Sequence, residues 1–178
     1  FAAVKHVRSE ENIQSLKYMF KTNSISFAPK KITNLKKIFS ISTDKTVNPS
    51  SFLGLSKHLM EMYLSKYKNK DIFVSSVRFA NVAFSNGSIL KYVVDRLIQK
   101  KEFGAPEFIK RYFITHSEAS NLCFKSLLER NNKKIVIPNP KLLDKDFSIT
   151  ELVEKITRQF GFLPKFYKKK TIVNNYKN

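Results

Sequence analysis

The sequence has 178 residues, of which 42% are hydrophobic and 16 are Phe, and this is enough apolar surface to build a globular core and to exclude a disordered chain. A net charge of +19 is common in proteins that bind nucleic acid, but only six of the 33 basic residues are Arg, and the Lys residues are spread over the whole chain. We therefore expect no nucleic-acid partner.

Strands and helices are predicted to alternate, because runs rich in β-branched and aromatic residues are separated by stretches with apolar residues at helical spacing. In chain order the predicted elements are the end of a strand at 1–3, a helix at 13–23, a strand at 37–42, a helix at 52–68, a strand at 71–79, a helix at 89–100, a strand at 109–114, a helix at 118–129, a strand at 134–137 and a helix at 149–160. This order predicts an α/β fold with a mostly parallel sheet and helices on both faces.

The predicted elements form one domain with a smaller lobe at its C-terminal end. We place the boundary between residues 1–84 and residues 85–178, and we expect the Lys- and Asn-rich tail from Leu163 to fray. The chain starts at Phe1 without a Met, apparently in the middle of an element, so it is expected to be a fragment. Whether the full-length protein has further segments upstream, such as a membrane anchor, stays an open question.

The apolar runs, the single Cys and the three His residues bear on cellular location and on metal binding. No apolar run approaches the roughly 20 residues of a membrane-spanning helix, so we expect no membrane insertion by this segment. Cys123 lies in an apolar helical stretch and is expected to pack in the core. A lone Cys fits a reducing compartment, and we expect a cytoplasmic location. The three His residues lack the spacing of a metal site, so no metal is predicted.

Three polar stretches, at 2–6, 42–49 and 81–88, follow predicted strands. Ligands of open α/β sheets bind beyond the carboxyl ends of the strands, so these stretches are the first indication of a site. Asp44 and Lys45 put an acid beside a base, which suits proton transfer. On spacing alone a surface ion pair is the favoured interpretation. Ser88 is a plausible helix cap, and Arg111 suits either a diphosphate contact or a solvated charge.

Six segments, taken together and in order, resemble the CapD-like polysaccharide-biosynthesis proteins, the family of the UDP-N-acetylglucosamine 4,6-dehydratases. They are AAVKHV at 2–7, KTN at 21–23, ISTDKTVNP at 41–49, GLSK at 54–57, VRFANVAFSNGS at 77–88 and KRYFIT at 110–115. Each motif is weak alone, but the ordered set is specific and spans about 70% of the chain.

The resemblance implies part of a Rossmann-like fold of the extended short-chain dehydrogenase/reductase type, without its N-terminal half. It further implies bound NAD or NADP, a UDP-sugar substrate, a homo-oligomer and a 4,6-dehydratase that acts either with or without inversion at C5. A fragment without the Gly-rich turn of that fold is expected to be inactive and poorly folded alone.

The resemblance also implies roles for individual residues. Asp44 would protonate the leaving C6 hydroxyl, Lys45 would take the C5 proton, and Thr43 would contact the sugar. The implied cofactor contacts are Ala2, Ala3, Asn23 and Lys57, where Lys57 holds the nicotinamide ribose. The implied substrate contacts are Thr43, Arg78, Asn81, Ser88 and Arg111. With this context we favour a catalytic role for Asp44 and Lys45 over a surface ion pair.

One position departs from the pattern of the class. Four residues before Lys57, where Tyr usually stands, the chain has Leu53, which cannot take the proton of the C4 hydroxyl. Two alternatives therefore stay open beside the dehydratase: a nucleotide-sugar epimerase of the same fold, and a catalytically degenerate homologue that binds a sugar nucleotide. The adjacent acid and base favour the dehydratase, because elimination of water needs both.

Overall fold

A computed structural model describes residues 3–5, 12–24, 34–67, 71–104, 109–139 and 146–162. The chain divides into two compact units, the first formed by Phe1–Val82 and Phe113–Asp144, and the second by Ala83–Tyr112 and Lys145–Asn178. The chain leaves the first unit after Val82 and returns to it at Phe113. The predicted division into residues 1–84 and 85–178 stays a prediction.

The first unit is built on a parallel sheet with the strand order β1-β2-β6. These strands are β1 (Lys37–Thr43), β2 (Phe73–Phe79) and β6 (Lys134–Val136). Thr43 lies opposite Phe79, so β1 and β2 end level with each other. The predicted parallel sheet is confirmed, and its carboxyl edge brings the segments after β1 and β2 together.

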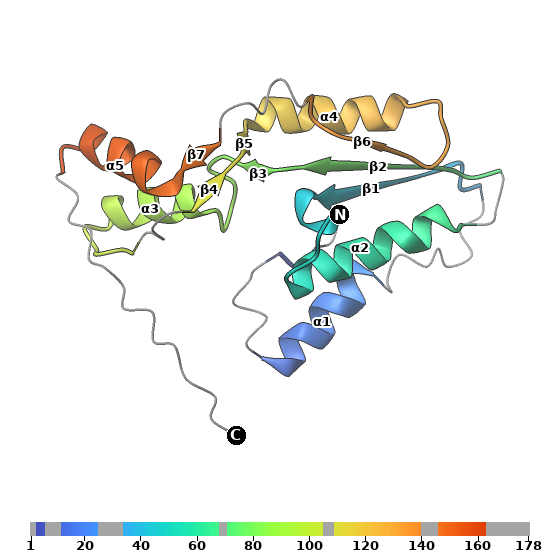
Figure 1. Cartoon of the computed structure of the whole chain (residues 1–178), viewed down its shortest axis with the longest axis horizontal. Coiled ribbons are helices and arrows are strands. Elements are labelled where there is room, and N and C mark those ends of the chain that lie inside the picture. The colour runs from blue at the N-terminus through green and yellow to red at the C-terminus, as the bar shows by residue number, and fades with distance from the viewer. Residues whose placement is uncertain are drawn as a thin grey trace. The chain divides into compact units, whose positions relative to one another are not determined.

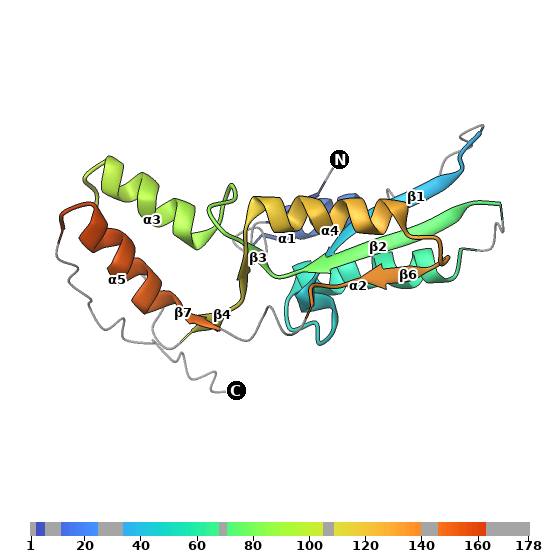
Figure 2. The same ribbon diagram turned by 90° about the horizontal axis from the view of Figure 1, so that it is seen from above.

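Helices cover both faces of this sheet, as predicted. Helix α2 (Phe52–Ser65) packs on β1 and β2 from one side, with α1 (Ile13–Asn23) against it, and α4 (His116–Leu128) lies on the other side (Figures 1 and 2). On the α2 side, Met60, Leu64 and Val74 form a buried apolar cluster. The burial of this cluster fixes α2 on the sheet, and α2 carries several of the predicted site residues.

Capping residues explain where the helices begin. The side chain of Asn12 accepts hydrogen bonds from the backbone at the start of α1, and Ser51 Oγ accepts one from Gly54 N at 3.2 Å at the start of α2. Thr115 and Glu118 form a reciprocal capping box at the start of α4. These side chains satisfy backbone N–H groups that have no partner within the helix.

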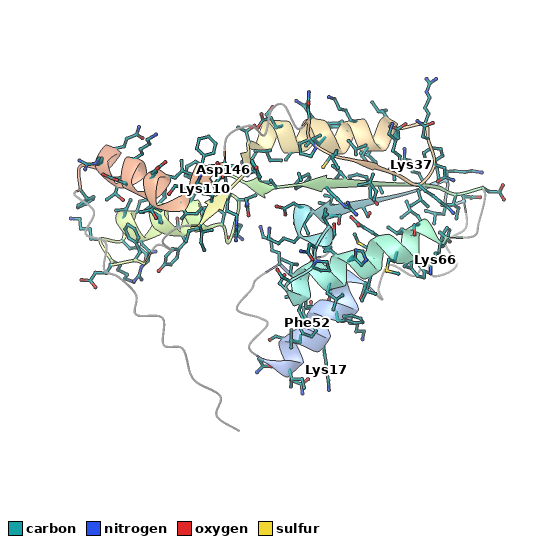
Figure 3. All side chains as sticks on the ribbon, viewed as in Figure 1. Lys17, Lys37, Phe52, Lys66, Lys110 and Asp146 are labelled. Atoms are coloured by element: carbon teal, nitrogen blue, oxygen red, sulfur yellow. The ribbon has the colours of Figure 1, made fainter. Side chains whose placement is uncertain are left out.

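In its described residues, the second unit contains two helices and a two-stranded antiparallel ribbon. Helices α3 (Ile89–Ile98) and α5 (Ile149–Gln159) bury apolar side chains, and β4 (Lys110–Arg111) pairs with β7 (Phe147–Ser148). Lys110 and Asp146 lie side by side at this ribbon, with Nζ and Oδ2 3.5 Å apart (Figure 3).

The predicted strand at 109–114 is wrong as one element. Its first part is β4 of the second unit, whereas its last part, β5 (Phe113–Ile114), pairs in parallel with β3 (Asn81–Val82) in the first unit. The split occurs at Tyr112 because the chain crosses between the units there, and its two halves find different partners. The predicted loop at 81–87 likewise begins with the short strand β3.

The two ends of the chain are described only in part. Ala3 is described and belongs to no strand, while the rest of the predicted strand at 1–3 and the tail from 163 lie outside the described residues. Ala2, an implied cofactor contact, also lies outside them. Within the described ranges, no helix is both long and apolar enough to cross a membrane.

Candidate active site

Asp44 and Lys45 lie in a one-turn 3-10 helix, η3 (Asp44–Thr46), that follows β1 directly. Lys45 Nζ is 3.1 Å from Asp44 Oδ1, and Thr43 Oγ1 donates a hydrogen bond of 2.8 Å to the same carboxylate oxygen. The Asp44 and Lys45 side chains are 44% and 36% exposed. An acid and a base are thus held together at the carboxyl edge of the sheet, where a ligand can reach both.

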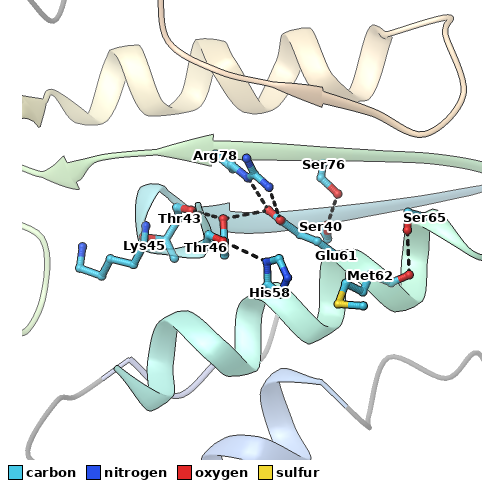
Figure 4. Close-up of polar contacts among 10 residues, drawn as sticks. All are labelled: Ser40, Thr43, Lys45, Thr46, His58, Glu61, Met62, Ser65, Ser76 and Arg78. Atoms are coloured by element: carbon cyan, nitrogen blue, oxygen red, sulfur yellow. Dashed lines mark hydrogen bonds and ion pairs between the residues drawn. The ribbon is translucent and has the colours of Figure 1, made fainter. Parts of the chain in front are cut away.

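The η3 turn is anchored from below by Thr46, which is fully buried. Thr46 Oγ1 carries one proton, and both the Thr43 carbonyl oxygen at 2.7 Å and Glu61 Oε1 at 3.4 Å are within its reach. The Thr46 carbonyl lies 3.0 Å from Nδ1 of His58 (Figure 4). The turn therefore carries accessible side chains on a backbone that is held by buried contacts.

The anchoring groups come from one face of α2. Gly54, His58 and Glu61 follow each other at spacings of four and three residues, which places them on the same side of a helix. A Cβ at Gly54 would stand 2.7 Å from the carbonyl oxygen of Lys45. Only a glycine lets α2 approach the turn this closely.

Lys57 lies on α2 with its ammonium group under β1. Its Nζ donates to the Ile41 carbonyl at 3.1 Å, and the residue is 8% exposed. Burial lowers the pKa of Lys57 below its ordinary value, and the nearby negative charge of Glu61 offsets part of this effect. An ammonium group has three donors, and Ile41 is its acceptor within the described residues, so the remaining N–H groups suit the hydroxyls of a ribose.

Arg78 and Glu61 form a two-point ion pair between β2 and α2. Arg78 Nε and Nη2 donate to Glu61 Oε1 and Oε2 at 2.8 and 2.5 Å, and Glu61 is 6% exposed. Burial opposes the charge of Glu61, but the hydrogen bonds and charge of Arg78, with the nearby hydroxyls of Ser42 and Thr46, hold the pKa of Glu61 below its ordinary value. The hydrogen bonds that Arg78 donates to Glu61 in turn raise the pKa of Arg78.

Asn23 is fully buried at the end of α1, and its side-chain amide is hydrogen-bonded to backbone and side-chain groups. Its Oδ1 accepts from Val4 N at 2.9 Å, and its Nδ2 donates to the Val4 carbonyl at 2.8 Å and to Ser56 Oγ at 3.1 Å. Asn23 therefore fixes the segment that contains Ala3, which is itself exposed. Its implied contact with a cofactor stays a prediction.

Asn23→Ala is expected to lower the free energy of unfolding by about 1–3 kcal/mol, because it leaves buried polar partners without hydrogen bonds. Denaturant unfolding of the complete gene product measures this change. Asn121→Ala is the control, since Asn121 is exposed on α4. Equal stability of the two variants would contradict the anchoring role.

The other predicted substrate contacts lie in two places. Asn81 begins β3 in the first unit, half-buried, with Phe113 as its register partner. Ser88 caps α3, where its Oγ accepts from Lys91 N at 3.2 Å, and Arg111 is exposed in β4; both belong to the second unit. The structure thus brings Thr43, Asp44 and Lys45 together, while Lys57 contacts the same strand at Ile41. The roles of the remaining residues stay predictions.

Thr46, His58 and Glu61 were missed by the sequence analysis. A signal for Glu61 exists, because it stands four residues after Lys57, within the apolar helix stretch that also supplies the buried Met60 and Leu64. A carboxylate on the buried face of a helix requires a partner. Within the described residues no cluster of His, Cys, Asp or Glu could hold a metal ion.

The sequence of this chain matches a known protein family over almost its whole length. The sequence model of the family described as "Polysaccharide biosynthesis protein" matches residues 1–175. The capsular polysaccharide biosynthesis protein CapD of Staphylococcus aureus is 32% identical over 136 residues, which are 71% of this chain and 21% of CapD. This chain is therefore much shorter than that relative.

Solved structures share the fold. The Bordetella bronchiseptica enzyme WbmF in complex with NADH aligns with a TM-score of 0.73 at 15% identity over 100% of this chain and 61% of that one. A double mutant of DesIV, a dTDP-glucose 4,6-dehydratase from Streptomyces venezuelae with NAD and DAU bound, aligns with a TM-score of 0.66 at 14% identity, covering 90% and 56% of the two chains. The match confirms the Rossmann-like α/β fold, and this chain covers 61% of WbmF and 56% of DesIV.

Proposed function

Because this chain belongs to the family of polysaccharide biosynthesis proteins, whose model matches residues 1–175, we propose that it forms part of a nucleotide-sugar 4,6-dehydratase. The proposed substrate is a UDP-linked N-acetylhexosamine, and the proposed pathway is the synthesis of a bacterial surface polysaccharide. The observation that carries this proposal is the Asp44–Lys45 pair, with 3.1 Å between acid and base at the end of β1.

Elimination of water across C5 and C6 needs one proton donor and one proton acceptor. In the proposed step, protonated Asp44 gives its proton to the leaving C6 hydroxyl, and neutral Lys45 takes the proton from C5. The step ends with a carboxylate and an ammonium, which is the ion pair found in the structure. When the hydride later returns to C6, Lys45 gives its proton back to C5. Asp44 then takes up one proton from solvent, which balances the proton released from the C4 hydroxyl, so both groups return to their starting forms.

A bound NAD or NADP would supply the redox chemistry: a hydride would leave sugar C4 and later return to C6, while C5 regains a proton. The ketone at C4 acidifies the C5 proton, so Lys45 acts only after that oxidation. Lys57 is suited to hold the nicotinamide ribose through its remaining N–H groups. WbmF and DesIV have NADH and NAD bound, respectively, and share the fold, which supports this proposal.

Leu53 supports a competing possibility. It lies one helical turn before Lys57, is nearly buried and has no titratable group, so it cannot accept the proton of the C4 hydroxyl. Another group must take that proton in a dehydratase. If none does, the protein is a degenerate homologue that binds a sugar nucleotide without oxidising it.

The complete gene product is expected to remove one water from UDP-N-acetylglucosamine, which mass spectrometry detects as a loss of about 18 Da from the sugar nucleotide in the presence of NAD or NADP. An unchanged mass would contradict dehydration of this sugar. NMR of the same sample then distinguishes a C4 epimer, which would favour the epimerase, from untouched substrate, which would favour the degenerate homologue.

A further inference from the structure

Hydrogen bonds connect the turn that carries Asp44 and Lys45 to helix α2 and strand β2. Thr46, the last residue of η3, bonds to the Thr43 carbonyl and to Glu61, and Glu61 bonds to Arg78 on β2. The chain of contacts therefore runs from the Asp44–Lys45 turn through Thr46 to α2, and from there to the neighbouring strand (Figure 4).

From this arrangement we infer that Glu61 is a positioning residue, which holds the Asp44–Lys45 turn in place through Thr46 while Arg78 holds Glu61. The inference rests on the proposed function, because only that function gives Asp44 and Lys45 a catalytic role that requires positioning. It also gives Arg78 a role different from the substrate contact that the sequence resemblance implies.

Burial and geometry distinguish this role from direct participation. Glu61 is 6% exposed and Thr46 is fully buried, so neither side chain lies open to a substrate. The Glu61 carboxylate uses both oxygens on Arg78, and Oε1 also accepts from Thr46. A carboxylate with both oxygens engaged is fixed in orientation, as a positioning group must be.

Stability alone is a weak explanation for this buried pair. Ion pairs taken out of water are often no more stabilising than apolar side chains of similar volume. The rest of α2 shows that apolar burial is available here, because Met60 and Leu64 fill neighbouring positions on the same helix. The ion pair differs from an apolar contact in that it can orient the Thr46 hydroxyl.

Two pairs of variants in the complete gene product test this role. Thr46→Val removes the hydroxyl and keeps the Glu61–Arg78 pair, and Glu61→Gln removes the charge that orients the hydroxyl. Each is expected to lower kcat for water loss about tenfold with little change in KM, because small displacements of catalytic groups slow the chemical step. Thr46→Ser keeps the hydroxyl and is expected to recover most of the kcat that Thr46→Val loses.

Glu154→Gln is the matched control for Glu61→Gln. Glu154 also accepts from two nitrogens of an Arg, at 3.0 and 2.7 Å from Arg158 Nε and Nη2, but this pair is exposed on α5. It is expected to leave kcat unchanged. Thermal unfolding of all variants shows whether a loss of kcat merely follows a loss of folded protein.

The outcomes separate this inference from the proposed function. If the wild-type protein removes no water, the proposed function fails and the inference falls with it. If the wild type is active and Thr46→Val matches it, or Thr46→Ser is as impaired as Thr46→Val, the positioning role alone is overturned. Loss of kcat in Thr46→Val and Glu61→Gln with unchanged KM and recovery in Thr46→Ser supports it.

Discussion

Asp44→Asn in the complete gene product is expected to lower kcat for loss of water by about 10²- to 10⁴-fold, the usual contribution of a general acid. Asn has nearly the shape of Asp and can still accept hydrogen bonds from Thr43 and Lys45, so the turn should keep its geometry. It has no acidic proton to give to the leaving hydroxyl. KM should therefore change little, and mass spectrometry of the sugar nucleotide measures the rate.

Asp95→Asn is the matched control for this substitution. Asp95 is 42% exposed and lies 2.7 Å from Lys91 Nζ, so it resembles Asp44 in exposure and in pairing, but it belongs to α3. It is expected to leave kcat within about twofold of the wild type, because exposed ion pairs contribute little. Full activity of Asp44→Asn would remove this acid from the mechanism and favour a reaction that needs none, such as epimerisation.

Local sequence was sufficient for much of the fold. The bounds predicted for the first helix, 13–23, are those of α1, because apolar periodicity and the Asn12 cap are both written in neighbouring residues. The strand predicted at 109–114 shows where such reasoning stops. Its residues suit a strand throughout, but the partners of β4 and β5 are far apart in sequence, and the split at Tyr112 depends on them.

Some features of the site follow from neighbouring residues, and others depend on residues that are distant in the sequence. The adjacency of Asp44 and Lys45 is visible in the sequence, and the expected order of strand, polar turn and helix is confirmed. The contacts that hold this turn in place are not visible in the sequence, because Glu61 is 15 residues from Thr46 and 17 from Arg78 along the chain. The apolar stretch around Glu61 indicates that its carboxylate needs a partner, but only the packing of α2 identifies Arg78 and Thr46 as that partner.

Gly54→Ala is expected to have the second large effect, about a hundredfold lower kcat, because displacement of a catalytic group by about 1 Å can have this consequence. The new Cβ would stand 2.7 Å from the carbonyl oxygen of Lys45, which is backbone and cannot rotate away. Either α2 or the η3 turn must move. The same substitution should reduce the free energy of unfolding by about 1–3 kcal/mol, the usual effect of overpacking.

The direction of the stability change decides between two effects. In a helix without a close neighbour, Ala is more stable than Gly by about 1 kcal/mol, so Gly54→Ala would be stabilising if the contact with Lys45 were unimportant. Gly104→Ala is the control, because a Cβ there meets no atom within 4 Å. Denaturant unfolding and kcat are measured on both variants. A Gly54→Ala protein that is more stable and fully active would show that the close approach of α2 does not set the geometry of the acid–base pair, whereas a loss of kcat larger than its loss of folded protein would show that it does.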